Sequence, residues 1–230
     1  MTAVAGNLAA VRARIASAAV AVGRDPREIE LLAVSKRQPA ASVREAHAAG
    51  QRLFGENRVQ EFGAKAGEVA DLDDVAWHMI GSLQTNKVRE LLAVRGLALL
   101  HSLDRVGLAD ALQRELARDP GRELATLLQV NATGEASKHG CEPDAAAALL
   151  EHIAAACPGI RVRGLMAMGP LAGDPAPVFA AVAALRQRLS DRFALPLPVL
   201  SLGMTGDLEA AVAAGSTLVR IGTAVFGERV

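Results

Sequence analysis

Residues 198–221 read PVLSLGMTGDLEAAVAAGSTLVRI. The apolar runs at its two ends, Pro198–Leu202 and Thr217–Ile221, are typical of short buried strands. The segment between them leaves room for one helix. A helix between two strands allows them to lie parallel in one sheet, so this stretch predicts a strand–helix–strand unit.

The same alternation of short apolar runs and helix-length segments extends back toward the N-terminus. It predicts six further strands, at Leu31–Ser35, Arg52–Phe54, Ala76–Ile80, Leu97–His101, Leu124–Val130 and Arg161–Met166. Helical segments are expected at Asp104–Arg118, Pro143–Ala156 and Pro175–Ser190. Eight such units in 230 residues favour a closed barrel over an open sheet. We therefore expect an α/β fold, a single (β/α)8 TIM-type barrel.

An extra helix is expected before the first strand. Apolar residues recur there at spacings of three and four and predict one helix face, formed by Leu8, Val11, Ile15, Ala18 and Val22. The sequence stops soon after the last predicted strand, which leaves no room for a full eighth helix. We expect residues 1–22 to pack on the barrel in its place, so that residues 1–230 form one barrel domain.

Composition limits the class of protein. Hydrophobic residues make up 51% of the chain, and 25 basic residues balance 25 acidic ones, which argues against a nucleic-acid binder. Cys141 and Cys157 fit neither a disulfide framework nor a zinc motif, and the five histidines have no metal-binding spacing. We see no signal peptide and no apolar run long enough to span a bilayer, and we expect a cytoplasmic protein that binds no membrane and no metal.

Lys36 stands at the end of the first predicted strand, where barrels of this kind bind their ligands. By strand alternation it shares a face with Leu32 and Val34. If that face is the barrel interior, partial desolvation favours the neutral amine that imine formation with an aldehyde requires. From spacing alone, a surface lysine at a strand end is the favoured interpretation.

Three polar residues mark other strands at the same end of the barrel. Arg220 lies inside the last strand, where a buried guanidinium needs acceptors. A ligand and a carboxylate on a neighbouring strand are equally favoured partners. Asn57 follows the second strand and either faces a ligand or caps the next helix. His78 ends the third strand, and a packed histidine is its favoured interpretation.

The loops after the last two strands suit a phosphate group. Barrels of this type often hold a phosphate in these two loops, where glycine lets backbone N–H groups approach an anion. The residues concerned are Ser201, Gly203, Met204, Gly222 and Thr223. The alternative interpretation is that these residues only form ordinary turns and bind no ligand.

Longer motifs connect these positions. They are LLAVSK at 31–36, FGENRVQEF at 54–62, WHMIGSLQTNKVR at 77–89, LLQVNATGEASKHG at 127–140, GLMAMGP at 164–170 and LSLGMTGDLEAAVAAGSTLVRIGTAVFGER at 200–229. In these motifs, from about residue 8 to the C-terminus, the chain resembles the pyridoxal phosphate homeostasis protein family. The resemblance implies a barrel similar to the N-terminal domain of alanine racemase, with pyridoxal 5′-phosphate (PLP) held as a Schiff base on Lys36.

The resemblance also implies roles for the other marked residues. It places Asn57 near the cofactor ring and Arg220 near the pyridine nitrogen. It places four residues at the phosphate: Ser201 and Met204 beside it, and Gly222 and Thr223 holding it through backbone groups.

One position departs from the family pattern. The family often carries a second lysine two residues after the Schiff-base lysine, and this chain has Gln38 there. Lys138 matches another family lysine. It is either an alternative PLP contact or a mobile, solvated lysine, and the second interpretation is the plainer one.

Two features favour a carrier over an enzyme. Arg220 only donates hydrogen bonds, so it should keep the pyridine nitrogen unprotonated and weaken the ring as an electron sink. Racemases of this fold use a second base, typically a Tyr from another domain, and this chain has no Tyr.

We expect a monomer that holds PLP for vitamin B6 homeostasis and passes it to apo PLP-dependent enzymes. A weak PLP-dependent amino-acid racemase is the alternative, and a PLP-free Schiff-base aldolase is disfavoured by the two phosphate loops.

Overall fold

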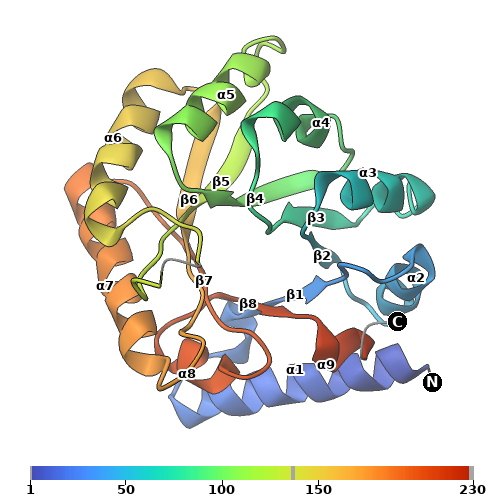
Figure 1. Ribbon diagram of the computed structural model, residues 1–230. Helices are drawn as coiled ribbons and strands as arrows, with labels where there is room; N and C mark the ends of the chain where they lie inside the picture. The colour runs from blue at the N-terminus through green and yellow to red at the C-terminus, as the bar shows by residue number, and fades with distance from the viewer. Residues whose placement is uncertain (1, 136–137, 228–230) are drawn as a thin grey trace.

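The computed structural model describes residues 2–135 and 138–227. In this part of the chain, parallel strands form a closed barrel in the order β1 to β8, with helices around it (Figure 1). The strands are β1 Glu30–Val34, β2 Leu53–Glu56, β3 Ala76–Met79, β4 Leu97–Leu103, β5 Leu124–Gln129, β6 Ile160–Met166, β7 Val199–Ser201 and β8 Leu218–Ile221. The predicted (β/α)8 barrel is confirmed, and each predicted strand lies within one or two residues of an observed one.

The helices follow the strands in alternation. They are α1 Ala3–Ala21, α2 Ala40–Ala48, α3 Val59–Glu68, α4 Val88–Leu92, α5 Val106–Leu116, α6 Ala146–Ala156, α7 Ala176–Phe193, α8 Leu208–Ala213 and α9 Thr223–Phe226. Short 3-10 turns occupy η1 Pro26–Glu28, η2 Thr85–Lys87 and η3 Pro143–Ala145. The predicted helical segments correspond to α5, to η3 with α6, and to α7.

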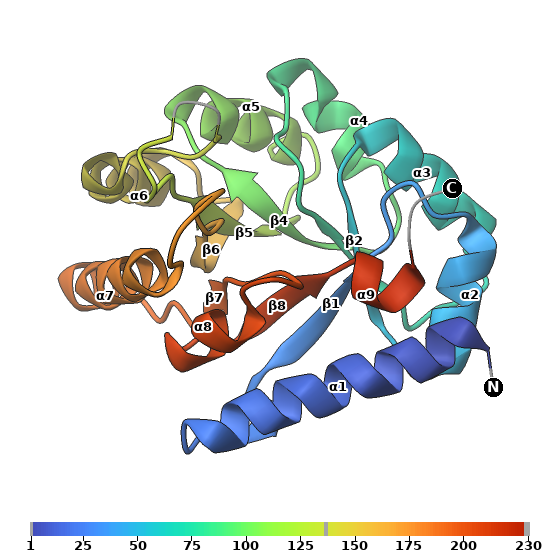
Figure 2. The same ribbon diagram turned by 60° about the horizontal axis from the view of Figure 1, so that its bottom comes forward.

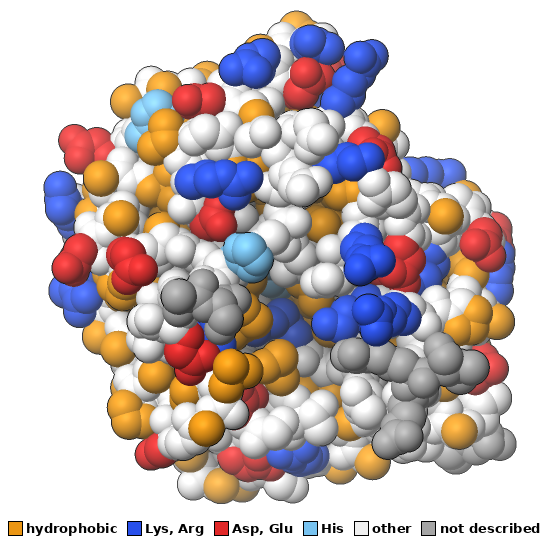
Figure 3. Space-filling model, in the orientation of Figure 1, with side chains coloured by type: hydrophobic (Ala, Val, Ile, Leu, Met, Phe, Trp, Pro, Cys, Tyr) orange, Lys and Arg blue, Asp and Glu red, His pale blue; other side chains and the backbone are white. Residues whose placement is uncertain are grey.

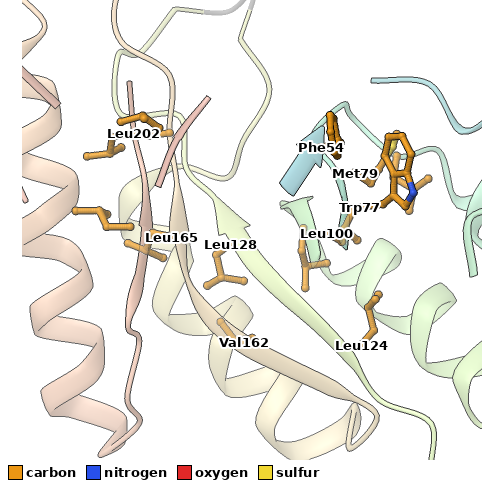
Figure 4. Packing of buried hydrophobic residues seen from close by; sticks show 14 of the residues in the cluster. Phe54, Trp77, Met79, Leu100, Leu124, Leu128, Val162, Leu165 and Leu202 are labelled. Carbon is orange, nitrogen blue, oxygen red and sulfur yellow. The ribbon is translucent and has the colours of Figure 1, made fainter. Parts of the chain in front are cut away.

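The larger apolar core lies between the barrel and its surrounding helices. Phe54 on β2 and Phe62 on α3 both pack against Trp77 on β3, with ring centroids 5.5 Å apart in each pair. Figure 4 shows Phe54, Trp77 and Met79 gathered on one side of this core. Such packing fixes β2 and β3 and therefore the loops that follow them.

A second, smaller apolar cluster fills the inside of the barrel. It consists of Leu99, Leu127 and Met166, from β4, β5 and β6. Side chains alternate along a strand, so His101 and Gln129 point the same way as Leu99 and Leu127 but lie nearer the carboxyl ends. The interior therefore changes from apolar to polar toward the end where the predicted site lies.

Helix α1 occupies the place of an eighth outer helix. It packs against α2, α8 and α9, and Figure 2 shows it lying along the outside of β1 and β8. Arg14 forms an ion pair with Glu209 on α8 at 2.6 Å, and the Asn7 side chain donates to the Val225 carbonyl at 3.0 Å. The expected burial of Val22 is wrong, because the helix ends before it and Val22 is 44% exposed.

The length and composition of α1 would suffice for a membrane span. The expectation that no apolar run is long enough is therefore wrong for this helix. Core helices pass the same test, and α1 buries one face against the barrel, including Val4, Leu8, Val11 and Ile15.

Deleting residues 1–22 should lower the midpoint of thermal and urea unfolding, because it uncovers the apolar surface beneath α1. As a matched pair, Leu8→Ala removes a side chain that is 0% exposed. It should cost about 2–5 kcal/mol. Val20→Ala changes a residue that is 68% exposed. It should change the free energy of unfolding by under about 0.5 kcal/mol. A truncated protein that melts like the full chain would contradict this role for α1.

Candidate functional site

A cavity of about 300 Å³ opens at the carboxyl ends of the barrel strands. Figure 3 shows a hollow near the centre of this face, with Lys and Arg side chains in it and beside it. Its apolar walls come from Val34, Ile80, Met166 and Met168. Of the predicted site residues, the cavity brings together Lys36, Asn57, Met204, Arg220, Gly222 and Thr223.

Lys36 lines the cavity and is half-buried. Strand β1 ends at Val34, so Lys36 lies in the turn that follows, and Arg37 next to it has a positive φ of 60°. The Arg37 backbone N–H donates to the Glu61 carboxylate on α3. The turn is therefore held to α3, and the lysine stands over the inside of the barrel rather than on its outer surface.

A buried ion pair supports the turns after β1 and β2. Lys65 Nζ on α3 donates to Glu56 Oε1 at 2.5 Å and to the Ser35 carbonyl at 2.7 Å. The Ser35 hydroxyl donates to the same Glu56 oxygen at 2.6 Å. Burial raises the pKa of Glu56, although Lys65 acts in the opposite direction. Because Ser35 precedes Lys36 and Glu56 precedes Asn57, this cluster fixes the backbone on both sides of the cavity.

Sequence reasoning missed this ion pair. Its signal was a glutamate at the end of a short apolar strand, followed nine positions later by Lys65 on a helix face that is otherwise apolar. A carboxylate in a strand that is buried on both faces needs a cationic partner.

Asn57 approaches the end of β3 closely. A Cβ atom placed on Gly81 would lie 2.1 Å from the Asn57 carbonyl oxygen, so only glycine fits there. Helix α3 begins at Val59 with Arg58 at its N-cap, which means that Asn57 does not cap this helix.

Arg220 forms the floor of the cavity. It is 6% exposed, and its Nη1 donates to the carbonyl and the hydroxyl of Ser201, both at 2.7 Å. Its Nη2 donates to the Ala167 carbonyl at 2.9 Å. Burial lowers the Arg220 pKa to about 10, so the guanidinium stays charged at neutral pH. The ion pair considered from sequence is replaced by carbonyl and hydroxyl acceptors.

Ser201 and Gly203 lie behind Arg220 and do not line the cavity. The Gly203 carbonyl accepts from the Arg220 backbone N–H at 3.0 Å. Gly203 has a φ of +91°, and a Cβ there would lie 2.6 Å from the Ala211 Cβ, so glycine is required for both backbone shape and packing. These two residues therefore hold Arg220 in place.

His78 is packed inside the barrel beneath the cavity, at 6% exposure. Its Nδ1 lies 3.0 Å from Nε2 of His101, which is fully buried on β4. Sequence reasoning did not single out His101. Its signal was its inward position in the run Leu97–Leu103, where every second residue faces the interior.

In the part of the chain that the structure describes, one cluster has side chains close enough to share a metal ion: Asp110, His152 and Cys157. It lies on and after helices α5 and α6, away from the cavity, and His152 Nε2 is 2.7 Å from the Asp110 carboxylate. Burial raises the pKa of the Cys157 thiol, which disfavours the thiolate that a metal would bind.

Comparisons with known proteins identify the family of this chain and bear out its fold. Residues 6–230 match the family model of the alanine racemase N-terminal domain. A relative in Pseudomonas aeruginosa, named pyridoxal phosphate homeostasis protein, is 49% identical over 231 aligned positions, and the alignment covers 100% of this chain and 97% of the relative. The chain belongs to the pyridoxal phosphate homeostasis protein family. The Escherichia coli relative of that name is 43% identical, covering 100% of this chain and 98% of its own length.

A solved structure shares the whole barrel. PipY of Synechococcus elongatus, solved with PLP bound, is 38% identical to this chain and superposes with a TM-score of 0.83. The superposition covers 97% of this chain and 100% of PipY. The same protein without PLP superposes with a TM-score of 0.86.

The structure also places Gln38 and Lys138, the two positions compared with the family pattern in the sequence. Gln38, where the family resemblance led us to expect a second lysine, lines the cavity. Lys138 is not the mobile, solvated lysine expected from sequence. Its side chain is 9% exposed, and its Nζ contacts the Gly169 carbonyl at 2.6 Å and the Glu135 carboxylate at 3.0 Å.

Proposed function

We propose that this chain binds PLP as a Schiff base on Lys36 and serves PLP homeostasis inside the cell. The observation that carries the proposal is the cavity, which is lined by Lys36, Arg220 and Gly222 together. Two comparisons support it: relatives are named for pyridoxal phosphate homeostasis, and PipY holds PLP in a barrel of the same shape.

The cavity matches the chemistry of PLP group by group. PLP supplies an aldehyde that condenses with a neutral amine, with loss of water, and Lys36 is the lysine in the described lining. Three N–H groups of Arg220 donate to described residues inside the barrel, and the others remain for an acceptor such as the ring nitrogen. Gly222 and Thr223 offer backbone N–H groups and a hydroxyl to the phosphate. The size of the cavity is within the range of small-molecule sites.

The same residues support a carrier rather than an efficient enzyme. Arg220 keeps its own proton and donates to the ring nitrogen, which leaves that nitrogen unprotonated. Among the described residues that line the cavity, Lys36 and Arg220 are the ionisable ones. We infer that the described lining offers no second base opposite Lys36, as a two-base racemase would require.

We further propose that the recipients are apo PLP-dependent enzymes and that the protein acts as a monomer in the cytoplasm. The two cysteines of the chain are free, as expected in a reducing compartment. The whole chain, residues 1–230, would act as one PLP-binding barrel domain.

A visible absorption spectrum of the purified protein tests PLP binding directly. We expect a yellow protein whose band disappears on borohydride reduction, with a phosphopyridoxyl group on the peptide that contains Lys36. A protein that stays colourless and gains no adduct after addition of PLP would overturn the proposal.

A racemisation assay distinguishes the carrier from the racemase. For the carrier, the loaded protein should racemise alanine no faster than free PLP does. Racemisation that exceeds this background and is lost in a Lys36→Ala variant would favour the enzyme.

A further inference from the structure

A chain of polar side chains crosses the inside of the barrel behind Arg220. His78 Nδ1 on β3 lies 3.0 Å from His101 Nε2 on β4. His101 Nδ1 lies 3.2 Å from the Ser201 hydroxyl on β7, and that hydroxyl accepts from Arg220 Nη1 on β8 at 2.7 Å. All four residues are at most 6% exposed. The chain runs from the interior to the floor of the cavity.

The charge of Arg220 favours one direction for the hydrogen bonds of this chain. A guanidinium only donates, so Ser201 Oγ accepts from it, and the Ser201 hydroxyl proton remains available for donation to His101 Nδ1. A neutral imidazole then carries its proton on the other nitrogen, so His101 Nε2–H donates to His78 Nδ1. The same step places the His78 proton on Nε2. In this arrangement the accepting atom of each residue faces along the chain toward the Arg220 guanidinium. Its positive charge favours this direction over the reverse one.

Both histidines are neutral in this environment. Burial lowers the pKa of His78 to about 4 and that of His101 well below its ordinary value. His101 is also next to His78 and Arg220, and both neighbours oppose a positive charge on it. The chain can therefore hold a single, defined set of protons at neutral pH.

We propose that His101 and His78 are positioning residues for Arg220, and that their hydrogen-bond chain sets the orientation of the guanidinium toward the ligand ring. The Ser201 hydroxyl accepts a hydrogen bond from Arg220 and donates its own proton to His101. His101 therefore fixes the orientation in which the hydroxyl oxygen faces the guanidinium. The aligned dipoles also stabilise a buried cation whose other partners are backbone carbonyls. The effect on the ligand rests on the proposed PLP binding, whereas the hydrogen-bond chain itself does not.

The chain can be tested in the protein without PLP. In ¹⁵N-histidine NMR spectra near neutral pH, the signals of His78 and His101 should both show the neutral ring protonated at Nε2. Single His78→Gln and His101→Gln variants assign the two signals. A charged ring, or a ring protonated at Nδ1, would overturn the proposed direction.

The effect on the ligand needs two variants of His101. His101→Leu removes the acceptor for Ser201, whereas His101→Gln can still donate and accept. We expect His101→Leu to weaken PLP binding roughly tenfold, which corresponds to one buried hydrogen bond, and to shift the visible band of bound PLP. His101→Gln should recover most of both properties. Ser201→Ala breaks the same link and replaces His101→Leu if that variant does not fold.

The outcomes separate this inference from the proposed function. A wild-type protein without a PLP band would remove the proposed function, and the NMR result would still decide whether the hydrogen-bond chain exists. If the wild-type protein binds PLP and the folded His101→Leu and Ser201→Ala variants keep its affinity and band position, only the positioning role is wrong. Variants that are less stable but keep the PLP affinity and the band position of the wild type would also contradict the positioning role. A purely structural role of these residues predicts that result.

Discussion

Replacing Lys36 with Ala should abolish the covalent attachment of PLP while leaving the barrel folded. Lys36 is the lysine in the described lining of the cavity, so its loss removes the amine that condenses with the aldehyde. The expected result is complete loss of the visible band that borohydride removes. Absorption spectra and mass mapping of borohydride-treated protein measure it, and circular dichroism checks the fold.

Lys138→Met is the matched control for this change. Lys138 lies in a family motif and is mostly buried, but its Nζ is held by Gly169 and Glu135 rather than in the cavity lining. This variant should keep the band and the adduct on Lys36. A phosphopyridoxyl group on Lys138 in the Lys36→Ala variant would show instead that the second lysine can take over the attachment.

Replacing Lys65 with Met should produce a large loss of stability. It leaves the Glu56 carboxylate, which is 0% exposed, without its cationic partner, and it removes the donor that holds the Ser35 carbonyl. Breaking one side of a buried ion pair typically costs about 3–5 kcal/mol. Urea unfolding at neutral pH, with the slope of the transition checked against wild type, measures the difference.

Lys87→Met provides the comparison, because Lys87 forms an exposed ion pair with Glu90 at 2.8 Å. Its removal should cost at most about 1 kcal/mol. The double variant Glu56→Gln with Lys65→Met should recover much of the loss, since no buried charge remains. A Lys65→Met protein that is as stable as Lys87→Met would mean that the ion pair is not needed for the fold.

The Lys65→Met loss should also depend on pH. Burial already raises the pKa of Glu56, and removal of Lys65 raises it further because a nearby cation is lost. A carboxyl whose pKa is higher in the folded than in the unfolded protein binds more protons when folded, so stability rises as the pH falls through the folded pKa. The deficit of Lys65→Met should therefore shrink on mild acidification.

The sequence predicted the barrel because each strand and helix carries its own local pattern. It also marked Lys36, which follows a recognisable apolar run, and Arg220, which interrupts one. These signals need no knowledge of which strands are neighbours. In a parallel barrel the carboxyl ends of all strands lie at one end. The residues predicted at strand ends therefore come together without further information.

The supporting partners could not be predicted in this way. His101 and Ser201 are 100 residues apart in sequence and meet only across the closed barrel. Which interior side chains face each other depends on the tilt and stagger of the strands, and periodicity does not give these quantities. Lys138 was misjudged because its partner, the Gly169 carbonyl, is 31 residues away.

The position of α1 has a consequence for synthesis on the ribosome. Helix α1 is made before α8 and α9, on which it packs, and β1 is made before β8, with which it pairs. At about 5–20 residues per second, its apolar face waits roughly 10–40 s for these partners. The nascent chain, rather than the finished barrel, is therefore the form that exposes the apolar face of α1. Slower translation would lengthen that exposure without altering the native state.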